Sequence, residues 1–243
     1  LGGLCGSQPI RRMDSGHELR KGSLSKDMMP MRKIIPWRAC LCGGWIMTVN
    51  VPGADLAKDP WRDARIVWHM RSLEASEEYP LSLQVNGDVT VGVRLEGDEY
   101  EQSLKRGGDG HVAVLNDNGW LSLDANRTNS LHTEGKDVTL YERVWLDPDG
   151  NGPLFFSDFL GLSIHPTGLA IAYLGTETPE GKVYRELPLG SIDRGKWLDL
   201  VLRTGGGQLD FFCNGSLIRT VPLRQNLVSP FEEGMAIGAF LWG

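Results

Sequence analysis

The stretch that decides the fold is Lys196-Trp-Leu-Asp-Leu-Val-Leu-Arg-Thr-Gly-Gly-Gly-Gln-Leu-Asp-Phe-Phe-Cys-Asn-Gly-Ser-Leu-Ile-Arg-Thr-Val-Pro-Leu223. Leucines occupy every second position from Leu198 to Leu202. Because successive side chains of a strand point to opposite faces, one face packs inward and the other meets water. Gly205-Gly-Gly207 and Asn214-Gly215 separate three such segments, and Asn-Gly favours a type I′ hairpin turn. The stretch predicts an antiparallel meander over 196–204, 208–213 and 216–223.

The same alternation occurs in Asp137-Val-Thr-Leu-Tyr-Glu-Arg-Val-Trp-Leu-Asp147. Glu142 interrupts the apolar face of this segment near its middle. The pattern indicates a strand with one face in the core. The apolar face carries Val138, Leu140, Val144 and Leu146, and the other carries Thr139, Tyr141, Arg143 and Trp145.

Short alternating segments with turns between them continue through most of the chain. Asn86-Gly87 and Asn118-Gly119 are further hairpin signals. Only 56–64 and 230–233 have a pattern suited to a helical turn. Regularly spaced short strands are typical of a β-sandwich or jelly roll, so we expect a mainly β, antiparallel fold. The remaining expected strands are 65–70, 81–85, 88–95, 111–115, 120–124, 153–158, 161–174, 181–187 and 235–241.

The charge balance divides the chain into two parts. The 243 residues contain 25 Lys+Arg and 31 Asp+Glu, a net charge of −6, which argues against a general nucleic-acid binder. Residues 1–50 hold 8 basic and 3 acidic residues, whereas the rest holds 17 and 28. This asymmetry predicts a leader or tail over 1–54 and a folded acidic domain over 55–243.

The first part has the order of a secretion signal. Met31-Arg-Lys33 is a positive start, 34–51 an apolar centre, and Pro52-Gly-Ala54 a small-residue exit. We therefore expect a secreted or periplasmic protein, with translation starting at Met29 or Met31 and 1–28 as upstream sequence. The uncharged run 39–54 is shorter than the ~20 residues of a membrane span, so no span is expected.

Three phrases resemble those of a known family: Gly195-Lys-Trp-Leu-Asp-Leu-Val201, Leu209-Asp-Phe-Phe-Cys-Asn-Gly215 and Ile237-Gly-Ala239. They are similar to the concanavalin A-like, laminin-G-type jelly roll. The greatest likeness is to the module beside the catalytic propeller of some bacterial glycoside hydrolase family 32 proteins, which act on fructans and sucrose. The likeness covers residues 65–243.

This resemblance implies a non-catalytic carbohydrate-binding module of an exported fructan-active enzyme. Its ligand would be an oligo- or polysaccharide, and a catalytic glycosidase domain would follow on the C-terminal side. The propeller's Asn-Asp-Pro-Asn nucleophile phrase is absent from this sequence. The module's closing strand would lie beyond Gly243. An adhesion or protein-interaction module is an alternative, since many laminin-G-like sandwiches serve that role.

A second alternative is a jelly-roll glucanase. Glu96-Gly-Asp98-Glu-Tyr-Glu101 matches the Glu-x-Asp-x-x-Glu phrase of those enzymes. Their mechanism needs two carboxylates on either side of the glycosidic bond. On a strand Glu96 and Asp98 would share a face. The competing interpretation is a solvated acidic strand end, because the intervening residues here are not apolar.

The residues that follow the alternating segment 137–147 resemble a calcium-binding loop. Asp147-Pro-Asp149-Gly-Asn151-Gly152 fits the first half of an oxygen-rich loop, and Asp158 falls at its twelfth position. Calcium takes six to eight oxygen ligands, which short acidic side chains on a tight turn can supply. A polar hairpin loop has the same composition.

Aromatic side chains could form a sugar-stacking platform, with polar groups fixing orientation. Trp145 is the best candidate, since it lies on the face opposite the aliphatic one and next to the acidic loop. Tyr141 and Phe155 are the next candidates. The others are Phe156, Tyr173, Tyr184 and Trp242.

Overall fold

The computed structural model describes residues 39–42, 45–49, 66–75, 81–106, 108–116, 118–123, 138–223 and 234–240. Only the backbone is described for 39–42, 45–49 and 66–67. The chain divides into the units Leu1–Lys33 and Ile34–Gly243, and every described residue belongs to the second. The helical turns expected at 56–64 and 230–233, and Trp242, lie outside the described residues.

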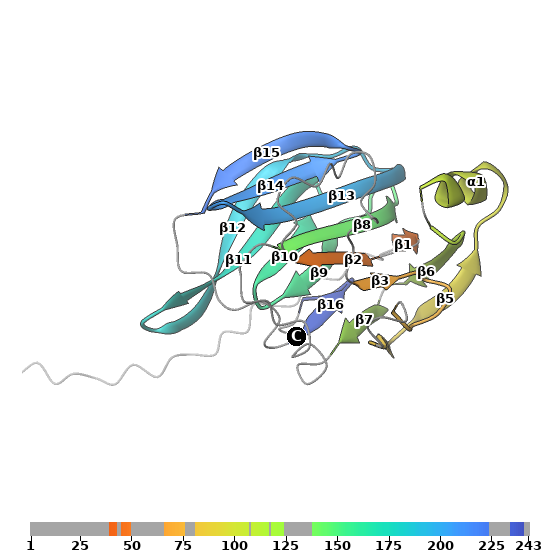
Figure 1. Cartoon of the computed structure of the whole chain (residues 1–243), viewed down its shortest axis with the longest axis horizontal. Coiled ribbons are helices and arrows are strands. Elements are labelled where there is room, and N and C mark those ends of the chain that lie inside the picture. The colour runs from red at the N-terminus through yellow and green to blue at the C-terminus, as the bar shows by residue number, and fades with distance from the viewer. Residues whose placement is uncertain are drawn as a thin grey trace, which may run out of the picture. The chain divides into compact units, whose positions relative to one another are not determined.

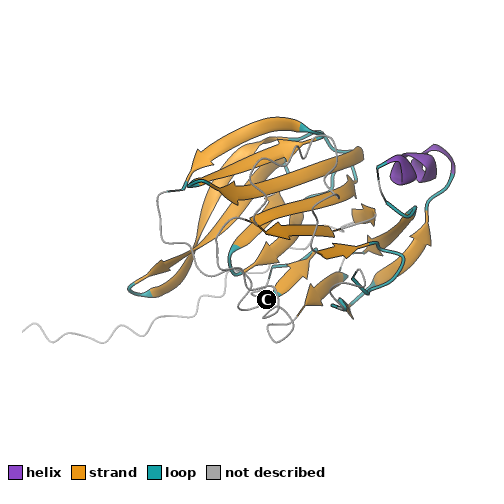
Figure 2. Ribbon diagram, in the orientation of Figure 1, coloured by secondary structure: helices purple, strands orange, loops and turns teal. Residues whose placement is uncertain are grey.

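Two antiparallel sheets make up the described part of the chain (Figures 1 and 2). The nine-stranded sheet runs in the order β15-β14-β13-β8-β1-β6-β5, and β2 pairs with β8 and β3. The seven-stranded sheet has the order β12-β11-β10-β9-β16-β7-β4. One helix, α1 (Gly97–Lys105), connects β5 to β6.

The strands of the nine-stranded sheet are β1 (Ala39–Cys42), β2 (Trp45–Val49), β3 (Ile66–Trp68), β5 (Val89–Arg94), β6 (His111–Leu115), β8 (Val138–Leu146), β13 (Lys196–Gly205), β14 (Gln208–Cys213) and β15 (Ser216–Pro222). Those of the seven-stranded sheet are β4 (Gln84–Asn86), β7 (Trp120–Leu123), β9 (Gly152–Ser157), β10 (Leu160–Ile164), β11 (Leu169–Thr178), β12 (Gly181–Ser191) and β16 (Met235–Ile237).

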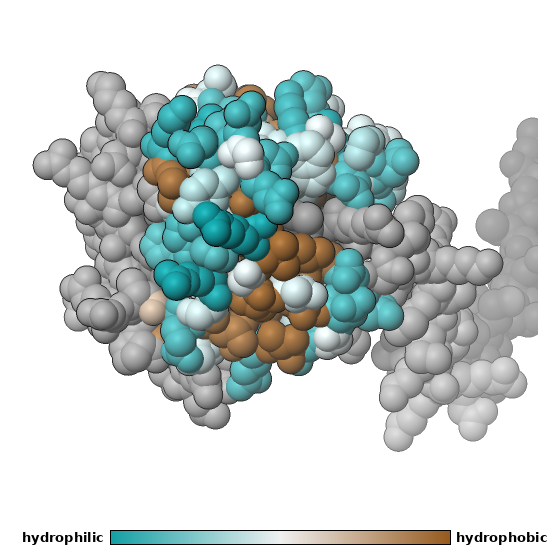
Figure 3. All heavy atoms as spheres, turned by 90° about the vertical axis from the view of Figure 1, so that its right-hand side faces the viewer, coloured by the Kyte–Doolittle hydropathy of each residue, from teal (hydrophilic) through white to brown (hydrophobic). Residues whose placement is uncertain are grey.

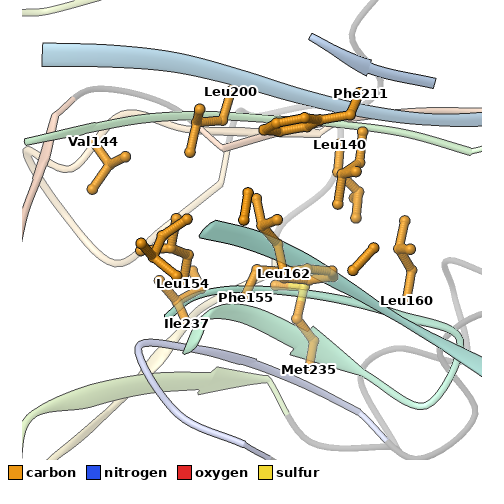
Figure 4. Packing of buried hydrophobic residues seen from close by; sticks show 14 of the residues in the cluster. Leu140, Val144, Leu154, Phe155, Leu160, Leu162, Leu200, Phe211, Met235 and Ile237 are labelled. Atoms are coloured by element: carbon orange, nitrogen blue, oxygen red, sulfur yellow. The ribbon is translucent and has the colours of Figure 1, made fainter. Parts of the chain in front are cut away.

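The hydrophobic core lies between the two sheets. Leu140, Val144 and Leu200 point into it from the nine-stranded sheet, and Leu154 and Leu162 face them from the seven-stranded sheet (Figure 4). All five side chains are at most 5% exposed. The expectation of a mainly β, antiparallel sandwich is therefore confirmed.

The predicted meander is confirmed, because β13 pairs with β14 and β14 with β15, both antiparallel. Asn214 and Gly215 have φ angles of 51° and 78° at the second hairpin, as a type I′ turn requires. Asn86-Gly87 and Asn118-Gly119 are not hairpin turns, since each connects strands of different sheets. A Cβ on Gly87 would overlap the Asn118 carbonyl, so the two connections between the sheets pack backbone against backbone.

One segment expected as a single strand is divided by a turn. The segment 161–174, expected as one strand, is β10 and β11 with a turn between them. The backbone N–H of Gly168 donates to the carbonyl of His165 at 2.8 Å, and Gly168 has a φ of 83°. Pro166-Thr-Gly168 has the composition of a turn, which overrides the apolar pattern on both sides.

The sandwich begins earlier in the chain than the expected boundary at residue 54. Strands β1 and β2 fall inside the segment expected as the apolar centre of a leader. Both pair with β8, and β1 also pairs with β6. An interrupted apolar segment is compatible with a sheet strand as well as with the apolar centre of a secretion signal. In this structure β1 and β2 are hydrogen-bonded strands of the nine-stranded sheet.

Candidate functional site

The outer face of the nine-stranded sheet carries the side chains of β8 and β13 that point away from the core. The register of these two strands sets Trp145 opposite Trp197 and Arg143 opposite Asp199. Tyr141 follows on the same face of β8. We call these five residues the Trp145 surface.

Asp199 is the centre of a hydrogen-bond network on the Trp145 surface. The Tyr141 hydroxyl donates to its Oδ1 at 2.7 Å, and Arg143 Nη1 lies 3.4 Å from the same oxygen. Arg106, just beyond α1, donates to Oδ2. The backbone N–H of Asp199 donates to Asn214 Oδ1 at 2.9 Å, which fixes the carboxylate relative to the turn of the meander. Both carboxylate oxygens thus already accept protein donors.

The two tryptophans of the Trp145 surface form a pair. Their ring centroids are 5.8 Å apart and their planes meet at 69°, an edge-to-face arrangement. The guanidinium of Arg143 lies over the Trp197 ring, 5.6 Å from its centroid. Both tryptophans are partly exposed, whereas Arg143 is 3% exposed. The surface therefore combines accessible rings with a charged network beneath them.

Two donors of the Trp145 surface have no acceptor in the described part of the chain. They are the Nε–H of Arg143 and the indole Nε1–H of Trp197, and both atoms are buried. A buried donor without a partner costs about 1–3 kcal/mol. Such groups are rare in native proteins, and a bound water, ion or ligand commonly explains them.

The structure brings Trp145 and Tyr141 onto one face but places Phe155 elsewhere. Phe155 is 2% exposed and belongs to the core. The pairing of β9 with β10 shifts between Leu162 and Ser163, which leaves Leu154 as an extra residue. At such a bulge two successive side chains can share one face, so Leu154 and Phe155 both point inward. Phe155 is therefore not available as a surface platform.

Phe156 follows on the opposite, outer face of the seven-stranded sheet. It packs against three rings, with centroid distances of 5.6 Å to Tyr173, 5.2 Å to Tyr184 and 5.2 Å to Phe240. Gly161 lies opposite it on β10, where a Cβ would clash with the Phe156 ring. We call these four aromatic residues the Phe156 cluster. It forms a second aromatic surface, on the other sheet.

The predicted calcium ligands are not brought together as a set of four. Asp147, Asp149 and Asn151 lie in the loop that connects β8 of one sheet to β9 of the other, where the Asn151 amide donates to the Asp149 carbonyl at 3.0 Å. Asp158 follows β9 at its other end and lies 3.7 Å from Lys182 Nζ. Within the described ranges, no three His, Cys, Asp or Glu side chains are grouped to hold a metal. Asp158 therefore lies at the opposite end of β9 from the loop, and calcium binding by these residues stays a prediction.

The strand expected around Glu96, Asp98 and Glu101 is a helix. Glu96 is the N-cap residue of α1, and Asp98 and Glu99 lie in its first turn, where carboxylates interact favourably with the helix dipole. All of these carboxylates are exposed. The premise that Glu96 and Asp98 share a strand face is wrong.

From the side of the molecule that carries α1, hydrophilic residues cover the upper surface above a hydrophobic area (Figure 3).

Sequence reasoning missed three members of this site as functional residues: Arg143, Asp199 and Trp197. Alternation along β8 already placed Arg143 between Tyr141 and Trp145. The missing information was the pairing of β8 with β13, two strands about 50 residues apart in the chain.

Among the described residues, no helix has the length and apolar character to cross a membrane.

Comparison with known proteins finds similar solved structures at low sequence identity. No protein-family model and no curated protein matches the chain. It is similar to domain 4 of AbnA, a GH43 extracellular arabinanase from Geobacillus stearothermophilus, solved in complex with arabinotriose. The identity is 15%, the match covers 71% of this chain and 80% of that one, and the TM-score is 0.47.

A second similar structure is the r-CATD of aly-SJ02, of polysaccharide lyase family 18. Here the identity is 14%, the match covers 50% of this chain and 59% of that one, and the TM-score is 0.29. Neither description names glycoside hydrolase family 32. The link to that family therefore stays a prediction from sequence.

Proposed function

We propose that the protein is a non-catalytic carbohydrate-binding module, with the Trp145 surface as its binding site. The observation that carries this proposal is the partly exposed tryptophan pair next to the hydrogen-bond network of Tyr141, Arg143 and Asp199. Sugar rings present apolar C–H faces that stack on aromatic rings, while fixed polar groups select their oxygens. The Trp145 surface offers both on one rigid sheet.

The Trp145 surface is favoured over the Phe156 cluster because of its polar groups. In the Phe156 cluster the Tyr173 hydroxyl accepts a long hydrogen bond from the Ser163 hydroxyl, at 3.4 Å. The rings there pack mainly on one another, and Phe156 itself is fully buried. Packing among rings stabilises a sheet face without requiring a ligand.

The proposed parent protein and its substrate follow from the sequence resemblance alone. We propose that the parent protein is an exported glycoside hydrolase with a catalytic domain on the C-terminal side. The module would raise the local concentration of enzyme on its polysaccharide through avidity. Fructan is the substrate that the resemblance suggests.

The Trp145→Ala variant tests the proposed site. We expect it to weaken binding about tenfold or more, because a central aromatic anchor is lost. Binding is measured by retardation in gels that contain inulin, levan, β-glucan or pectic polysaccharide. Tyr184→Ala, which removes a partly exposed ring from the other sheet, is the matched control and should keep wild-type retardation.

Opposite results would separate the alternatives. Loss of retardation in Tyr184→Ala but not in Trp145→Ala would move the site to the Phe156 cluster. No retardation in any gel, with capture of a defined protein partner, would favour the adhesion module. Release of reducing sugar that disappears in Glu96→Gln would favour the glucanase.

A further inference from the structure

The connection between β5 and β6 brings an arginine to the Trp145 surface. Arg106, the C-cap residue of α1, donates through Nη1 to Oδ2 of Asp199. Strands β6, β1, β8 and β13 are consecutive in the nine-stranded sheet, so three strand spacings, about 14 Å, separate β6 from the strand of Asp199. Because Asp199 lies on the face opposite the core, Arg106 reaches it from the outer side of the sheet. The C-terminal end of α1 therefore borders the Trp145 surface.

Contacts at the start of β6 hold α1 in this position. The Ser103 hydroxyl accepts a hydrogen bond from the backbone N–H of Gly110 at 3.2 Å, and Ser103 is 1% exposed. The Tyr100 ring lies so close to Gly110 that a Cβ there would overlap it. The guanidinium of Arg94 lies over the same ring, 4.9 Å from its centroid. These contacts fix α1 independently of Arg106, so the ion pair of Arg106 is not needed to place the helix.

Arg106 differs from Arg143 in its accessibility. The side chain of Arg106 is 52% exposed, whereas that of Arg143 is 3% exposed. A guanidinium carries five N–H donors and no acceptor, and the contact with Asp199 Oδ2 uses one nitrogen, Nη1. An ion pair with one partner this exposed contributes little to the stability of the fold. The half-exposed side chain can therefore present further N–H groups to a ligand.

The contact with Asp199 also holds this guanidinium close to the tryptophan pair. Trp197 and Asp199 are successive outward positions of β13, which are about 7 Å apart along a strand. We infer that Arg106 is a specificity-determining residue of the glycan site, with the C-terminal end of α1 as one side of that site. Its N–H groups donate to the hydroxyl or ring oxygens of a sugar that stacks on the tryptophan pair. This inference rests on the proposed function and adds a binding residue outside the Trp145 surface.

The test measures glycan affinity in variants of α1. Calorimetry of the full chain is carried out with oligosaccharides of inulin, levan, β-glucan and pectic polysaccharide. For a sugar that binds, Arg106→Ala should weaken binding about tenfold, as expected for the loss of a hydrogen bond to a charged group. Arg106→Lys should keep part of the affinity, because it retains the charge but not the planar fork. Lys105→Ala, which removes the neighbouring exposed cation, is the matched control and should bind like the wild type.

Two further measurements separate a ligand contact from a structural role. The urea midpoint of Arg106→Ala should stay close to that of the wild type, because an exposed ion pair contributes little to stability. In the wild type, the NMR signal of the Arg106 Nε–H, assigned by its absence in Arg106→Lys, should move as sugar is added. It should saturate at the same sugar concentration as the indole signal of Trp145.

Each outcome has a distinct meaning. If Trp145→Ala weakens binding but Arg106→Ala binds like Lys105→Ala, the inference is overturned and the proposed function stands. Absence of binding to every sugar would overturn both. Weaker binding by Arg106→Ala together with an unmoved Arg106 Nε–H signal would also overturn the inference, because Arg106 would then act on the site without contacting the sugar.

Discussion

Replacing Glu142 with leucine is expected to raise the free energy of unfolding at neutral pH by about 1–4 kcal/mol. Glu142 lies on the core face of β8 and is 4% exposed, and among the described residues neither of its carboxylate oxygens has a hydrogen-bond partner. A buried carboxylate without partners is strongly disfavoured. The small cavity around it is lined by Leu140, Tyr141, Phe155, Leu162, Leu200 and Leu202.

The same residue should make stability depend on pH. Burial raises the pKa of Glu142 well above its usual value of 4.5. The folded state then binds more protons than the unfolded state between these two pKa values, so the free energy of unfolding falls as pH rises through that window. Among the residues lining the cavity, Tyr141 is the one other titratable side chain, and its hydroxyl donates to Asp199 on the outer face.

Urea unfolding of the wild type, Glu142→Leu and Glu142→Gln at a series of pH values between 4 and 9 measures this effect. Both variants should lose the contribution of Glu142 to the pH dependence of the free energy of unfolding. Glu142→Gln removes the charge but keeps the shape of the side chain, so it distinguishes the effect of charge from that of shape. A Glu142→Leu variant that is less stable than the wild type at pH 7 would show that the carboxylate has a stabilising partner.

Phe155→Ala is expected to lower the free energy of unfolding by about 3–5 kcal/mol, the usual cost of emptying a phenylalanine site in a core. Phe155 lies between the sheets and faces the same cavity as Glu142. Glycan affinity of the folded variant should be unchanged, because the residue does not reach the Trp145 surface.

Val183→Ala is the control for this substitution, since Val183 is 44% exposed and surface changes of this kind stay within about 0.5 kcal/mol. Denaturant unfolding gives the stability and gel retardation gives the binding. A small stability loss accompanied by loss of retardation would restore Phe155 as a platform residue.

The sequence predicts the fold best where alternation and turn chemistry agree. The leucines of β13 and the Asn214-Gly215 turn predict the meander almost to the residue. Prediction failed where one local signal was ambiguous. Alternation alone could not indicate that Leu154 is an extra residue in β9, so Phe155 was proposed as a platform residue although it lies in the core. Similarly, the acidic run after Glu96 fits a strand end and a helix start equally well.

The candidate site could be predicted only in part for a related reason. The outward positions of Tyr141 and Trp145 follow from the period of one strand. The contact of Arg143 with Asp199 depends on the register between β8 and β13, which the period of either strand leaves open. The core position of Glu142 was visible as a break in the apolar face. That only apolar side chains of the opposite sheet, Phe155 and Leu162, line the described cavity around it could not be predicted from the strand alone.

The most direct test of the central claim is an NMR titration that follows the tryptophan indole N–H signals. The chain has 8 tryptophans, and Trp→Phe variants assign the signals of Trp145, Trp197 and Trp68. Trp68 is fully buried, and its indole donates to the Leu81 carbonyl at 3.0 Å, so it is an internal reference. On addition of oligosaccharides of inulin, levan, β-glucan and pectic polysaccharide in turn, the signals of Trp145 and Trp197 should move with a common saturation curve for a sugar that binds, while that of Trp68 stays in place. Saturable binding that leaves both Trp145 and Trp197 signals unmoved would contradict the account.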